Sequence, residues 1–162
     1  MRRIVSYTLL TVLLVALHST LVNVISIGTA IPDVLLIWIV YISITSTQLN
    51  GTLAGFAIGL LVDLISGNDG MLGLSALTKA VAGFLAGYFY NENMTEQTLA
   101  GWKFVFAVGV VSLLHNAVYF LIFLQGTEIS WWRIVALHGI PSALYTTTLA
   151  TVPMFVFRRK YS

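Results

Sequence analysis

The sequence predicts an all-α integral membrane protein, built as a bundle of six transmembrane helices. Of its 162 residues, 58% are hydrophobic and only 9% are charged, and the mean hydropathy is +0.92. Soluble domains carry roughly a quarter charged residues, so this composition points away from a water-soluble fold. The longest polar stretch, Asn91–Trp102, is too short to form a core of its own. We therefore expect one polytopic membrane domain over residues 1–162.

Six apolar segments are expected to form the helices. They cover Ile4–Ile25, Val34–Thr47, Thr52–Ile65, Leu72–Tyr90, Phe104–Leu124 and Trp132–Phe157. The first follows two arginines, but its apolar run is longer than the core of a signal peptide, so we expect it to be retained. The second and third are short, because a spanning helix needs roughly 20 residues. In an alternative with four crossings, residues 32–67 form a re-entrant pair.

The basic residues predict the orientation of the bundle. They cluster at both chain ends, at residues 2–3 and 158–160. Because basic residues next to membrane helices favour the cytoplasmic side, both termini are expected in the cytoplasm, which requires an even number of crossings. Six crossings also place Lys103 and the polar loop Asn91–Trp102 inside.

Prolines mark the second and sixth segments. Pro32 and Asp33 open the second segment, where proline suits the first turn and a carboxylate is stabilised by the helix dipole. The sixth segment contains Pro141 and Pro153. It also contains four threonines, Thr146, Thr147, Thr148 and Thr151. We expect a bent helix in which threonine hydroxyls satisfy carbonyls that the prolines leave free.

The third and fourth segments carry small residues at every fourth position. Residues four apart lie on one row of a helix surface, and small residues let helices approach closely in lipid. One row is Gly51, Gly55, Gly59 and Asp63, and the other is Ser75, Lys79, Gly83 and Gly87. We expect these rows to form a helix-packing ridge between two antiparallel helices.

One register of this hairpin predicts an intramembrane charge pair. It aligns Asp63 with Lys79, Gly59 with Gly83 and Gly55 with Gly87. Pairing reduces the cost of a lone charge in the membrane, which is roughly 2.5–3.5 kcal/mol or more. We interpret the pair as structural. Two alternatives stay open: Asp63 accepts hydrogen bonds from the turn at Ser66–Asn68, or the pair serves a proton or ion pathway.

Further polar side chains lie within the apolar segments. His115 and Asn116 lie midway along the fifth, and His138 lies in the outer part of the sixth. Together with Asp33 they are candidates for a polar pocket or a partner contact. No two histidines have the i, i+4 spacing of metal ligands, so we expect no metal site. The chain has no cysteine, nucleophile elbow, phosphate-binding glycine loop or basic groove, which predicts no enzymatic activity, cofactor or nucleic-acid binding.

The stretch from Pro32 to Leu77 resembles the family of the rod shape-determining protein MreD. The matching runs are PDVLLIWIVYISI, GFAIGLLVDLISG and LGLSAL. They reproduce a proline-led helix, a GF-x-x-G-x-x-x-D-L-x-S-G segment and an LG-x-x-AL helix start. Elsewhere the chain is similar in its pattern of spans and its basic tail. Lys79 departs from the family pattern, so the charge pair would be a local feature.

This resemblance implies a non-enzymatic scaffold of the bacterial cell-elongation machinery, or elongasome, which sets cell shape and directs peptidoglycan synthesis. It would lie in the inner membrane among the membrane lipids and bind the single-span protein MreC. Through MreC it would help couple MreB filaments to the synthase RodA and its transpeptidase partner.

A second resemblance is architectural, to the six-helix substrate-binding subunits of vitamin importers. Those subunits dock through an Ala-x-x-x-Ala pattern on the first helix, where this chain has Ala16 alone. The alternative function is accordingly a small-molecule-binding or transport subunit, with a polar pocket around Asp63, Lys79 and His115.

Overall fold

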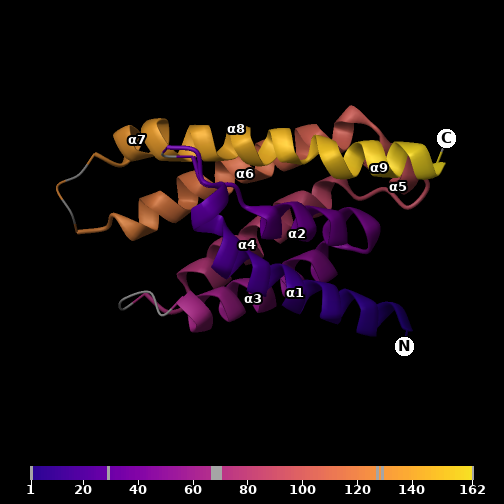
Figure 1. The fold of residues 1–162 in the computed structure, drawn as a ribbon, viewed down its shortest axis with the longest axis horizontal. Coiled ribbons are helices and arrows are strands. Elements are labelled where there is room, and N and C mark those ends of the chain that lie inside the picture. Colours follow the sequence, from indigo (N-terminus) through magenta and orange to yellow (C-terminus); the bar gives the residue numbers. More distant parts are fainter. Residues whose placement is uncertain (1, 29, 67–70, 127, 129, 162) are drawn as a thin grey trace.

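The computed structural model describes residues 2–28, 30–66, 71–126, 128 and 130–161, and Figure 1 shows their arrangement. The helices are α1 (Arg2–Ile25), α2 (Val34–Thr45), α3 (Gln48–Ser66), α4 (Leu74–Ala86), η1 (Gly87–Phe89), α5 (Thr95–Ala100), α6 (Trp102–Phe123), α7 (Trp131–Ile134), η2 (Val135–Gly139), α8 (Ile140–Leu149) and α9 (Thr151–Tyr161). Within these described residues the one β-type contact is an isolated bridge between Ile27 and Ala30. The prediction of an all-α fold is confirmed.

Three helical stretches among the described residues are long and apolar enough to cross a membrane. They are Gln48–Ile65, Trp102–Phe123 and Trp131–Lys160. The shorter apolar helices Ser6–Thr20, Val34–Thr45 and Leu74–Phe89 fall within the other three predicted segments. These findings fit a membrane protein, while six crossings remain a prediction.

The polar stretch Asn91–Trp102 is more ordered than the loop expected from its sequence. It contains α5, which lies beside α9 near the C-terminus (Figure 1). Thr98 and Leu99 of α5 are buried, and Leu99 belongs to the main hydrophobic core. A polar segment folds here because the neighbouring helices supply the apolar surface that its own sequence lacks.

Helix α2 lies at the centre of the bundle, between α1 and α3 on one side and α8 and α9 on the other (Figure 1). Eight of its 12 residues are buried: Leu35, Leu36, Ile37, Ile39, Val40, Ile42, Ser43 and Ile44. Its length of about 18 Å is well short of the roughly 30 Å of a bilayer core. If α2 lies in a bilayer, at least one of its ends is therefore inside the hydrocarbon core and not at the membrane surface.

Helices α3 and α4 form the expected antiparallel hairpin, with glycines at the contact. A methyl group added to Gly55 would overlap the carbonyl of Lys79, and one added to Gly59 would overlap the carbonyl of Ser75. One added to Gly83 would overlap the carbonyl of Gly51. These backbones approach so closely that only glycine fits at the three positions.

The register of this hairpin differs from the predicted one. Gly59 faces Ser75 instead of Gly83, a shift of eight residues (83 minus 75). Gly87 consequently meets Gln48 instead of Gly55. The periodic glycines permit both registers, because a shift of two steps along the same row again places small residues in contact.

Helix α2 meets the hairpin at Gly51. An added methyl group on Gly51 would overlap the side chain of Ser43 in α2. The Ser43 hydroxyl donates a hydrogen bond of 3.1 Å to the carbonyl of Gly83. Three helices thus converge on two glycines and one buried hydroxyl.

The last helical stretch contains a π-helical turn, η2, immediately before Pro141. There the amide of Ile140 donates to the carbonyl of Val135, five residues earlier. The hydroxyls of Thr146 and Thr147 donate to the carbonyls four residues before them, at 2.8 and 2.6 Å. These hydroxyls therefore bond to helix carbonyls as expected, but to those of Ser142 and Ala143 and not to those that the prolines leave free.

Candidate functional site

Asp33 lies at the start of α2 as predicted, but it is the N-cap, so Pro32 precedes the helix and does not lie in its first turn. Its Oδ1 accepts a 2.9 Å hydrogen bond from the amide of Leu36, and its own amide donates 3.0 Å to the hydroxyl of Thr146 in α8. Two residues earlier, the amide of Ile31 donates 3.0 Å to the hydroxyl of Ser142. The start of α2 is therefore held by α8, 113 positions away in the sequence.

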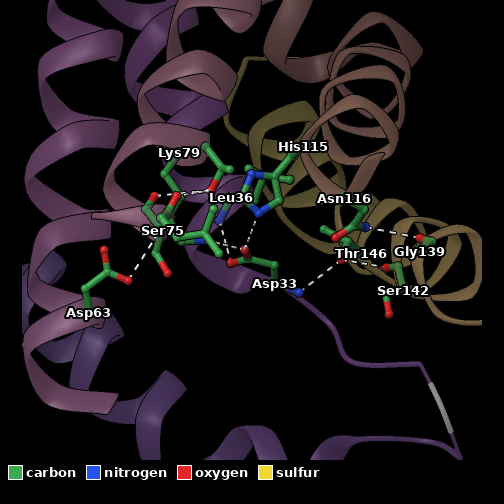
Figure 2. Close-up of polar contacts among 12 residues, drawn as sticks. Asp33, Leu36, Asp63, Ser75, Lys79, His115, Asn116, Gly139, Ser142 and Thr146 are labelled. Atoms are coloured by element: carbon green, nitrogen blue, oxygen red, sulfur yellow. Dashed lines mark hydrogen bonds and ion pairs between the residues drawn. The ribbon is translucent and has the colours of Figure 1, made fainter. Parts of the chain in front are cut away.

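Lys79 of α4 forms an ion pair with Asp33, through Oδ2 (Figure 2). The lysine side chain is only 5% exposed and that of Asp33 is 20% exposed. Nε2 of His115 lies 3.8 Å from the same carboxylate oxygen. A cation at this depth needs a carboxylate beside it, and the short helix α2 brings Asp33 to the required level.

The predicted charge pair between Asp63 and Lys79 is therefore corrected. Asp63 is buried, with 3% exposure, and accepts hydrogen bonds from three amides at the start of α4: Gly73 at 3.0 Å, Ser75 at 3.2 Å and Ala76 at 3.1 Å. Figure 2 shows Asp63 on the far side of α4 from Asp33. The N-cap residue of α4 is Gly73, which has no side chain to satisfy these amides, so the carboxylate of α3 does so.

The alternative interpretation, in which Asp63 accepts hydrogen bonds from the turn after α3, is close to what the structure shows. The carboxylate does bind backbone amides next to that connection, but they belong to the first turn of α4. Residues 67 and 68 of the proposed turn lie outside the described residues.

His138 and Asn116 meet at the π-helical turn. His138 belongs to η2, and the side-chain amide of Asn116 in α6 donates 3.1 Å to the carbonyl of Gly139 in the same turn. A π turn holds about one more residue than an α turn, so the helical segments before and after it are rotated relative to each other by about 100° compared with an unbroken α-helix.

These groups surround a cavity of about 430 Å³. It is lined by residues from α1 to α8, namely His18, Ile31, Pro32, Asp33, Val62, Ser75, Lys79, His115, Asn116, Tyr119, Phe120, His138 and Ser142. The cavity is lined by all four of the predicted pocket candidates, Asp33, His115, Asn116 and His138. Asp63 does not line it, although the predicted pocket included it.

The cavity is suited to binding rather than to metal chemistry. Within the described part of the chain, no three His, Cys, Asp or Glu side chains lie close enough together to hold a metal ion. The imidazoles, the ammonium group and the hydroxyls instead supply hydrogen bonds and charge in a poorly solvated place. Ionisable side chains inside a membrane bundle mark a functional site by default.

The comparison with protein families decides what kind of protein holds this cavity. The model of the rod shape-determining protein MreD matches residues 1–161. The chain belongs to the MreD family. MreD-family membership connects this bundle with the determination of rod shape, and it extends the resemblance from the segment 32–77 to nearly the whole chain. No curated protein and no solved structure matches the chain, so the resemblance to vitamin-importer subunits gains no support.

Sequence reasoning found five members of the MreD cavity, but it gave Lys79 the wrong partner. It also missed His18 and Ser142 as members of the lining. The sequence did contain a signal for the correct pair. Asp33 lies at the start of α2, and Lys79 lies five residues after the start of α4, a helix that runs in the same direction. The ion pair between Asp33 and Lys79 shows that the start of α2 lies at the level of Lys79 and not at the start of α4.

Proposed function

We propose that this MreD-family protein is a non-enzymatic scaffold of the cell-elongation machinery in the bacterial inner membrane. It crosses the membrane six times, with both termini in the cytoplasm, and binds MreC. Through MreC it helps couple MreB filaments to RodA and its transpeptidase partner. The family match over residues 1–161 is the observation that carries the proposal.

The exposed surface of the bundle supports a scaffold role. Large apolar side chains are exposed along α1 and α6, for example Leu9 at 66%, Leu13 at 54% and Phe106 at 64%. Such surfaces suit lipid tails and the membrane span of a partner. The rigid glycine contact between α3 and α4 would keep that surface in one shape.

The polar interior supports the same role. Asp63 binds three backbone amides and Asp33 binds Lys79, so both buried carboxylates are used to hold helices together.

The proposal is tested by replacing the chromosomal gene with a tagged copy and measuring cell shape and co-purification together. Cells without the protein should become round, and the tagged protein should restore rods and bring MreC with it from solubilised membranes. Ala57→Leu, an exposed position on α3, should behave like the native chain, whereas Gly55→Leu should lose both properties. Rod-shaped cells in the absence of the protein, or purification without MreC, would contradict the scaffold role.

A further inference from the structure

We propose that the cavity between Asp33, Lys79 and His138 binds a phosphate-bearing group that enters from the side predicted to face outward. This inference is independent of the scaffold role, because it rests on the lining of the cavity and not on any partner protein.

The polar lining contains N–H donors that are not fully used, beside hydroxyl, amide and imidazole groups that can donate as well as accept. Asp33 is the only carboxylate among the described lining residues, and its oxygens already accept from Leu36 and Lys79. The Lys79 ammonium carries three N–H groups but has one acceptor among the described residues. His18 and His138 add imidazole N–H groups on opposite helices. In a site this poorly solvated, surplus donors favour an anionic, oxygen-rich group.

Part of the lining is apolar, and the volume of the cavity fits a ligand. Ile31, Pro32, Val62 and Phe120 cover part of the wall. The cavity of about 430 Å³ falls in the range of small-molecule sites, roughly 300–1,000 Å³. A ligand that joins a phosphate group to an apolar part would match a wall that has both polar and apolar regions. The head group of an outer-leaflet phospholipid and a soluble phosphate ester share that chemistry.

The π-helical turn is a second observation that points to this place. Single π turns are rare within helices and occur frequently at functional sites. This one includes His138 and is fixed by the bond from Asn116 to Gly139, and both side chains line the cavity. The turn thus aims an imidazole at the cavity from the helix opposite α1, which carries His18.

The test uses the purified full-length protein in detergent and follows its melting temperature during ligand addition. The probes are inorganic phosphate and dioleoylphosphatidylglycerol, with dioleoylglycerol as the lipid that lacks phosphate. His138→Glu and His18→Glu each place a negative charge in the cavity from a different helix. Gln125→Glu adds the same charge at an exposed loop position outside the cavity, and His138→Gln keeps a donor at the site.

At least one phosphate probe should stabilise the native chain, Gln125→Glu and His138→Gln, while dioleoylglycerol should not. Either glutamate in the cavity should raise the concentration of the phosphate probe needed for the same rise in melting temperature by about tenfold or more, because one charge-assisted hydrogen bond is lost. Stabilisation by the phospholipid alone identifies a lipid head group, and stabilisation by inorganic phosphate as well identifies a soluble anion site. Three results would overturn the proposal. They are equal responses in all variants, equal stabilisation by dioleoylglycerol, and no response of the native chain to either phosphate probe.

Discussion

Asp33 uses its two carboxylate oxygens for different purposes. One caps α2 through the amide of Leu36, and the other binds the buried ammonium of Lys79. A substitution that removes the charge but keeps the cap therefore separates the two contributions. Asparagine does so, because it is as good an N-cap as aspartate.

We predict that Asp33→Asn and Lys79→Met each destabilise the protein by roughly 3–5 kcal/mol if the remaining charge stays buried, and by less if it gains access to water. The double variant should recover part of the loss, since neither charge is then left alone. Thermal or denaturant unfolding in detergent measures all four proteins as a double-mutant cycle. Additive losses would show that the two charges are not coupled in the folded protein.

Asp63 provides the matched control for that cycle. Asp63→Leu should cost roughly 1.5–3 kcal/mol or more, because amides in the first turn of α4 lose a charged acceptor. Its effect should add to that of Lys79→Met, since the two side chains do not pair. A coupling between positions 63 and 79 as large as that between 33 and 79 would restore the originally predicted pair.

At the scale of elements, the α3–α4 hairpin shows what the sequence could and could not predict. The glycine rows correctly identified the two helix faces that meet. They could not fix the register, because rows with a repeat of four residues also fit after a shift of eight. The register depends on Asp63, whose carboxylate fits either Lys79 or the first turn of α4. The sequence alone does not say that Gly73, with a φ of +99°, leaves that turn without a side-chain cap.

The close contact in the hairpin leads to a prediction for single methyl groups. Gly55→Ala and Gly59→Ala should each lower the melting temperature, because the added methyl overlaps a backbone carbonyl that cannot move without shifting α4. Ala57→Leu adds more bulk on the exposed side of the same helix and should leave stability nearly unchanged. Melting curves of the three purified variants make the comparison, and unchanged stability in both alanine variants would rule out the contact.

At the scale of the whole molecule, the fold was more predictable than the candidate site. The length of the apolar segments was enough to predict the main helices, since it follows from the thickness of the bilayer. The orientation inferred from the basic ends stays a prediction. The cavity was predicted only in part. Its members come from α1, the segment 31–33 before α2, α3, α4, α6, η2 and α8, so its assembly depends on helix depths that local patterns do not contain. His18 in particular looks like an ordinary polar residue of α1 until α2 is known to start deep in the bundle.

The orientation in the membrane has a direct test, because the chain contains no cysteine and single cysteines can be introduced cleanly. Cysteines at Glu96 and Arg159 should react only when the cytoplasmic face is accessible, and one at Glu128 should react with an impermeant reagent in intact cells or spheroplasts. All three positions are exposed. Labelling of Glu96→Cys or Arg159→Cys from outside would contradict six crossings with internal termini.

The central position of α2 has a consequence for biosynthesis. In the finished bundle this helix is enclosed by protein, so it does not need an apolar side chain at every position to face lipid. During synthesis, however, it leaves the ribosome before α4 and α6 exist, and must enter the bilayer without them. Twelve residues are too few to span it, and the connection to α3 is only two residues, Ser46 and Thr47. Helix α2 must therefore insert together with α3 as a hairpin, and its apolar residues on every side serve that transient stage as well as the final core.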